Sequence, residues 1–155
     1  MTDLHVLLVF DGVCLFVPQN EVESVEIIAD VQMTRTDMGA VGWFFGHGLE
    51  SPVFCLAEDF SLELDTPKNR EYFVLLKAEQ QPLGITCDEV ENIKFKQEHL
   101  YPQDLPVAMK TQDSPISQLV VYRDKIGYVC RGAALVRHLN LLSERFTQLE
   151  SASFG

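Results

Sequence analysis

The sequence contains nearly the same phrase twice, as NEVESVEI from Asn20 to Ile27 and as DEVENIKF from Asp88 to Phe95. Each copy follows a strand, a turn and a second strand. A β unit of about 60 residues is marginally stable alone, whereas two that pack together bury more apolar surface. The repeat therefore predicts that a β supersecondary unit is duplicated within one domain.

Two hairpins precede the two phrases. The runs LHVLLVF (Leu4–Phe10) and VCLFV (Val13–Val17) are joined by Asp11-Gly12, a pair that favours the positive φ angles of a two-residue hairpin turn. The runs EYFVLLK (Glu71–Lys77) and LGITC (Leu83–Cys87) are joined by a longer turn. Both hairpins lead directly into a copy of the phrase.

The segments after each phrase also resemble one another. SPVFCLAEDF (Ser51–Phe60) predicts a strand that breaks into an acidic turn or short helix. SQLVVYRDK and KIGYVC predict a pair of strands, followed by a break at Gly132 and a helix. One face of that helix carries apolar residues at spacings of four and three: Leu135, Leu139, Leu142, Phe146 and Leu149. This face is expected to pack on the sheets, or alternatively to bind a partner, with His138 on the polar side.

Composition limits the possible functions. The 155 residues are 46% hydrophobic and 23% charged, which is typical of a single globular domain. The net charge of −11 argues against binding to nucleic acid or to an anionic membrane. It fits a basic protein partner, or simply an acidic solvated surface.

The sequence indicates a cytoplasmic protein. The start, MTDLHVLLVF, lacks the positive charge of a signal peptide, and its apolar run is too short for membrane insertion. Four widely spaced cysteines lie among strand-forming residues: Cys14, Cys55, Cys87 and Cys130. Reduced, buried thiols explain them better than disulfides or a zinc site.

No pattern for catalysis is present, so we predict that the protein is not an enzyme and has no catalytic residue, metal site or cofactor. Nucleophile elbows, phosphate loops and zinc-binding helices are missing. Four histidines show no ligand spacing: His5, His47, His99 and His138. The adjacent acids Glu58-Asp59 and Asp88-Glu89 could form acid–base pairs, but such neighbours are expected by chance in an acidic chain.

The segment VGWFFGHGLESPVFCL places three aromatic residues, Trp43 to Phe45, directly before Gly46-His47-Gly48. Two interpretations remain open. The aromatics are core residues followed by a glycine turn, or they form a recognition loop in which aromatic rings supply contact area.

Several motifs, taken in order, resemble the CheW family of chemotaxis coupling proteins. Pro18, Val22 and Val25 match the residue spacing that is typical of that family after its first two strands. Further matches are Gly42, Gly48, Pro52, Val53, Phe54 and Leu56, then LGITCDEVENI and IGYVCRGAALVRHL. The resemblance extends from Leu4 to Leu142.

The resemblance implies an all-β fold of two intertwined, five-stranded SH3-like barrels around a shared core, with a C-terminal helix. Residues 1–155 would form one CheW-like domain of two β subdomains, at about 13–65 and 66–125, with both termini contributing to the core.

The resemblance also implies a non-catalytic adaptor for chemotaxis or twitching motility. Its partners would be the regulatory domain of a CheA-type histidine kinase and the cytoplasmic tip of a chemoreceptor. Partner-binding residues are expected at Val22, Ser24, Phe45, Gly46, His47 and Gly48. His47 stands where the family has Arg, and Ser24 where it often has Glu. An alternative is an SH3-like regulatory or ligand-binding module outside a receptor–kinase array.

Overall fold

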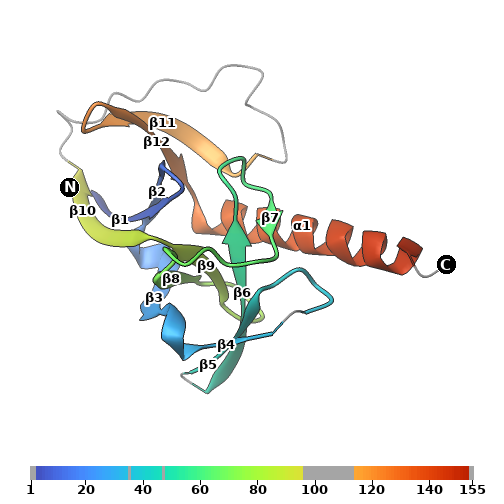
Figure 1. Ribbon diagram of the computed structural model, residues 1–155. Coiled ribbons are helices and arrows are strands. Elements are labelled where there is room, and N and C mark those ends of the chain that lie inside the picture. Colours follow the sequence, from blue (N-terminus) through green and yellow to red (C-terminus); the bar gives the residue numbers. More distant parts are fainter. Residues whose placement is uncertain (1–2, 35, 47, 96–113, 154–155) are drawn as a thin grey trace.

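The computed structural model describes residues 3–34, 36–46, 48–95 and 114–153 (Figure 1). Two curled β-sheets and one C-terminal helix make up the described chain, which confirms the predicted all-β fold with a terminal helix.

The first sheet has five strands. Their order is β10 (Glu89–Phe95), β1 (Asp3–Phe10), β2 (Val13–Pro18), β12 (Lys125–Cys130) and β11 (Ile116–Tyr122). All neighbours are antiparallel except β2 and β12, which are parallel. The β1–β2 turn has Asp11 at φ 49° and Gly12 at φ 80°, as the Asp-Gly pair predicts.

The second sheet has seven strands. Six follow the order β3 (Val22–Ile27), β8 (Tyr72–Leu76), β9 (Leu83–Cys87), β6 (Leu49–Leu56), β5 (Gly42–Gly46) and β4 (Val31–Met33), and β7 (Leu62–Glu63) pairs with β6. Here too one central pair, β9 and β6, is parallel. Two 3₁₀ turns, Gln19–Glu21 and Ile28–Asp30, flank β3.

The two sheets repeat one pattern of pairing. The order β10-β1-β2-β12-β11 corresponds to β3-β8-β9-β6-β5, with the same sequence of antiparallel and parallel pairs. The repeated phrases form the corresponding strands β3 and β10. Each phrase pairs with the hairpin of the other copy: β3 with β8, and β10 with β1. The repeat in the sequence is therefore a repeat in the structure, with the two hairpins exchanged, because β12 and β6 also pair with the hairpin of the other copy.

Both sheets consequently combine strands from the two segments, 13–65 and 66–125, that were expected as subdomains. That division stays a prediction. Consistent with the exchange, the largest core cluster contains residues from both sheets.

Alternating side chains of the central strands pack into different hydrophobic clusters. In β8, Phe73 and Leu75 point into a cluster within the second sheet, whereas Val74 and Leu76 belong to the largest cluster. That largest cluster also contains residues of β1, β2 and the helix. Strands buried on both faces read as continuous apolar runs, as these sequences do.

Helix α1 (Gly132–Ser153) closes the largest core and begins at the predicted glycine. Leu135 and Leu139 are fully buried, and Leu142 packs partly against the same cluster. Phe146 is partly buried beside Gly39, whereas Leu149, also predicted on this face, is 70% exposed, so the packed part of the face ends before Leu149. His138 is not simply polar surface, because its Nε2 lies 2.8 Å from the carbonyl oxygen of Phe60.

Candidate functional site

The residues selected from the sequence fall on two parts of the second sheet. Val22 and Ser24 are half-buried on β3. Phe45 and Gly46 end β5, and Gly48 lies in the following turn at φ 75°. Strands β8, β9 and β6 separate β3 from β5 in the sheet. His47 lies outside the described residues.

Strand β3 exposes different residues from those selected. Val25 is 40% exposed and Ile27 is 50% exposed, and Glu23 lies beside them on the same alternating set. These apolar side chains at a sheet edge were missed because the alternation alone does not say which face is covered. The exposed fractions of Val25 and Ile27 show which face is open, and β3 is paired only with β8 among the described strands.

The aromatic segment divides between the two interpretations. Phe44 is buried and meets Phe73 edge-on at 5.2 Å, so it belongs to the core. Phe45, the next residue, is 56% exposed at the end of β5. A side chain at Gly46 would collide with the Phe44 ring, which explains the glycine there. This hairpin therefore combines a core aromatic with an exposed one.

A buried ionic cluster joins the two sheets. The Arg70 side chain is fully buried, and its Nη2 donates to Asp11 Oδ2 and to the Leu56 carbonyl, both at 2.8 Å. Its Nη1 donates to Thr86 Oγ1 at 3.1 Å, and its Nε lies 3.2 Å from Asp88 Oδ1. Most donors of the guanidinium are thus engaged by protein groups. This arrangement is structural, because it leaves no open side for a substrate.

The adjacent acids likewise have structural roles. Asp88 belongs to the Arg70 cluster, and its backbone amide donates to the Val9 carbonyl at 2.7 Å. Asp59 accepts hydrogen bonds from the backbone amide and hydroxyl of Ser61, and these bonds lower the pKa of its carboxyl group. The segment after β6 is accordingly a tight turn, one of the two outcomes expected for it.

The four cysteines are free and buried, as predicted. Burial raises the pKa of the Cys55 thiol, and it raises the pKa of Cys87 and of Cys130 to about 12. Thiols with a raised pKa stay protonated near neutral pH and are poor nucleophiles.

A groove lies between the β8–β9 turn and helix α1, and its two walls meet at Glu21. The carbonyl oxygen of Glu21 accepts from the Lys77 amide at 3.0 Å, which holds the start of the turn. Its Oε1 accepts from the Gly132 amide at 2.8 Å, which holds the start of the helix. A carboxylate at this point also complements the positive end of the helix dipole.

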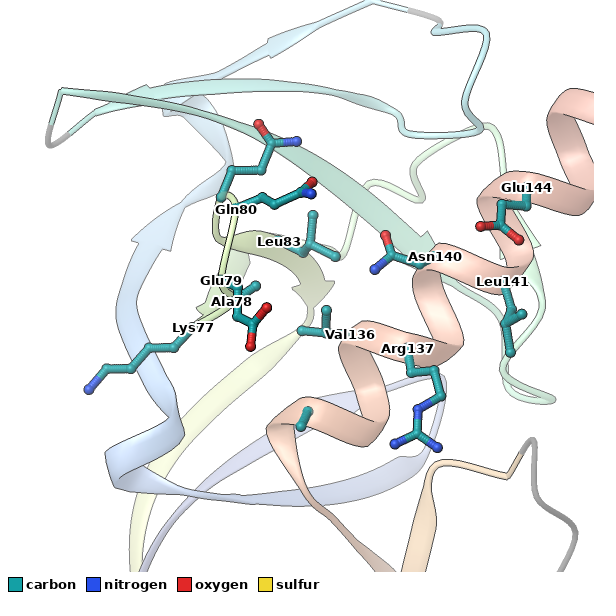
Figure 2. A pocket seen from close by; sticks show the side chains of 12 residues that line it. Lys77, Ala78, Glu79, Gln80, Leu83, Val136, Arg137, Asn140, Leu141 and Glu144 are labelled. Atoms are coloured by element: carbon teal, nitrogen blue, oxygen red, sulfur yellow. The ribbon is translucent and has the colours of Figure 1, made fainter.

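The groove has a volume of about 810 Å³, in the range of ligand-binding cavities. Leu83 and Val136 supply apolar surface, and amide side chains come from both walls (Figure 2). The full lining is Lys77, Ala78, Glu79, Gln80, Gln81, Leu83, Ala133, Val136, Arg137, Asn140, Leu141 and Glu144. Sequence reasoning missed this site, because its walls come from segments that are 50 residues apart in the sequence.

Within the described ranges, no group of three or more His, Cys, Asp or Glu side chains could hold a metal ion. No helix of the described chain has the length and apolar character needed to cross a bilayer.

Comparison with known proteins identifies the fold. No protein-family model matches the sequence, and no curated protein matches it either. Solved structures do match, among them the crystal structure of the scaffolding protein TtCheW from Thermoanaerobacter tengcongensis. The TM-score is 0.65 and the sequence identity is 17%, over 84% of this chain and 89% of that chain. The chain therefore has a CheW-like fold.

Proposed function

We propose that this CheW-like chain is a non-catalytic cytoplasmic adaptor in chemotaxis or twitching-motility signalling, which couples chemoreceptors to a CheA-type histidine kinase. The structural likeness to a scaffolding protein is the observation that carries this proposal. Because function resides in sites rather than in folds, the proposal also needs a surface suited to a partner.

Strand β3 is the proposed contact surface. Exposed apolar side chains at a sheet edge, bordered by charged ones, are typical of protein contacts. Val25 and Ile27 supply the apolar part, and Glu23 supplies charge.

The duplicated unit provides an internal comparison for this surface. Ile93 of β10 corresponds to Val25 in the repeated phrase, yet it is only half-exposed and packs against a cluster of the first sheet. Val90, the other apolar residue of β10 whose exposure is described, is likewise only partly exposed. At the positions that can be compared, β3 therefore exposes more apolar surface than β10, as expected if β3 contacts a partner.

The hairpin of β5 and β6 would extend the contact. Phe45 projects from its end together with the exposed Leu49, which is its neighbour in the turn region. The selected residues Phe45, Gly46 and Gly48 thus remain part of the proposed surface, whereas His47 lies outside the described residues.

A calorimetric titration against the C-terminal regulatory domain of the CheA-type kinase from the same organism tests the proposal. Binding in the micromolar range, about −8 kcal/mol, is the expected result. A parallel titration with a soluble fragment of the receptor tip tests the second partner. The adaptor role would be refuted if the folded protein bound neither the kinase domain nor the receptor fragment.

The groove favours a second candidate function, a regulatory or ligand-binding module outside a receptor–kinase array. The open groove has a volume of about 810 Å³, which is in the range of ligand-binding sites. Ligand binding in the groove by protein that binds neither kinase nor receptor would support this second function.

A further inference from the structure

The charged side chains around the groove are oriented unequally. Figure 2 shows Lys77 and Arg137 extending away from the space between the turn and the helix. Glu79, by contrast, points from the turn toward Val136, and the Glu144 carboxylate points toward Asn140. The two carboxylates therefore face the space, whereas the charged ends of the two lining cations point away from it.

The uncharged lining is amphipathic. Leu83 and Val136 form an apolar surface between the walls, and the Asn140 amide is directed toward Leu83 (Figure 2). Gln80 and Gln81 add further amides from the turn. Each amide oxygen accepts hydrogen bonds, and an aliphatic surface next to carboxylates suits a long side chain that ends in a cation.

We propose that the groove binds a Lys or Arg side chain from an exposed basic segment of a partner protein. The aliphatic stem lies on Leu83 and Val136, and the charged end lies between the carboxylates of Glu79 and Glu144. The groove is held ready for this ligand, because Glu21 fixes both of its walls.

Charge complementarity supports this occupant over others. The chain carries a net charge of −11, so its field attracts a basic segment and repels an acidic one over the Debye length. A purely apolar ligand would leave the two carboxylates without a partner and would remove part of their hydration.

This inference does not rest on the adaptor proposal. The groove lies at the end of β8 that is paired with Val22, whereas Ile27 pairs with Tyr72 at the other end of that strand. A kinase contact at Val25 and Ile27 could be absent while the groove still binds its ligand. Equally, the groove could fail to bind a ligand while the kinase contact is kept.

The probe for the test is the peptide acetyl-Leu-Ala-Arg-Ala-Leu-amide, titrated into labelled protein and followed by amide chemical shifts. Two further peptides replace its arginine with norleucine or with glutamate. We expect the arginine peptide to bind most tightly and to shift the amides of Glu79, Leu83 and Asn140. Binding should weaken as salt is added.

Charge-removing variants locate the site. Glu79→Gln and Glu144→Gln should each weaken binding of the arginine peptide about fivefold, since partly exposed ion pairs contribute at most about 1 kcal/mol. Glu50→Gln, an exposed glutamate of β6 outside the lining, is the matched control and should leave the affinity unchanged.

Four results would each overturn the proposal. They are no binding at millimolar peptide, equal binding of the norleucine or glutamate peptide, shifts confined to other surfaces, and equal affinity of all three variants. Unchanged kinase binding by Glu79→Gln and Glu144→Gln would show that the groove and the adaptor surface are separate.

Discussion

Arg70 donates a hydrogen bond to Asp11 over 2.8 Å, although 59 residues separate them in the sequence. Asp11 lies in the β1–β2 turn of the first sheet, and Arg70 precedes β8 of the second. Arg70 also lies 3.2 Å from Asp88, which begins the second repeated phrase. The guanidinium therefore fixes the point at which the two copies of the unit meet.

Arg70→Met should destabilise the protein by about 3 kcal/mol, because it leaves two partly buried carboxylates and two further acceptors without their donor. Chemical denaturation measures the free energy of unfolding. Arg123→Met is the control, since Arg123 lies in an exposed turn over the Tyr122 ring and its loss should cost less than about 1 kcal/mol. Equal losses for the two variants would contradict the role assigned to Arg70.

Glu21→Ala should cost about 1 kcal/mol, because the amide at the start of α1 loses its acceptor and the helix dipole loses a complementary charge. Glu21→Gln keeps an acceptor oxygen, so it should cost less. The exposed Glu23→Ala serves as control and should be nearly neutral. Denaturation curves that rank the three variants differently would show that Glu21 does not hold the helix.

The buried thiols should make stability fall at alkaline pH. Cys87 and Cys130 have folded-state pKa values of about 12, against 9.0 for a free thiol. Between these values the unfolded chain has released protons that the folded chain retains, so unfolding becomes more favourable as pH rises. Each thiol contributes a slope of at most about 1.4 kcal/mol per pH unit in that window.

Cys130→Ala provides the check on this slope. The variant should be less stable near neutral pH because of the lost packing, but its stability should fall less steeply above pH 9. Denaturant midpoints measured from pH 7 to pH 11 would reveal the difference. Parallel curves for the two proteins would rule out a contribution from this thiol.

The double variant Val25→Asp with Ile27→Asp should weaken kinase binding by at least about tenfold, because two carboxylates would have to be buried in the interface. The two positions are exposed, so the melting temperature should change little. Ile126→Asp places a carboxylate at a similarly exposed apolar position of β12 and should bind normally. If Ile126→Asp weakened kinase binding as much as the double variant does, β3 would not be the contact surface.

Local elements were readily predicted from the sequence. The Asp11-Gly12 turn, the hairpins and the helix start at Gly132 follow from backbone preferences that involve only neighbouring residues. The duplication was visible in the repeated phrase. The exchange of the two hairpins was not, because strand pairing between distant segments leaves no mark on the spacing of residues within either strand.

The candidate sites were harder to predict for the same reason. Arg70 is a single basic residue in an unremarkable loop, and only the folded chain brings its partners together. Glu21 was noticed as part of the phrase, but its contact with Gly132 spans 111 residues. The exposure of Val25 and Ile27 depends on which strands lie next to β3, which the alternation of side chains does not specify.

The exchanged strands bear on how such a chain could have arisen. A single copy of the unit would lack the hairpin that completes its own sheet, and a second copy could donate it only by receiving the same hairpin in return. The ancestor of this chain would thus have been a two-fold symmetric dimer with swapped strands. Within one chain that pairing no longer depends on protein concentration, and each half is free to diverge, so that Val25 is exposed on β3 whereas Ile93 on β10 packs against a cluster of the first sheet.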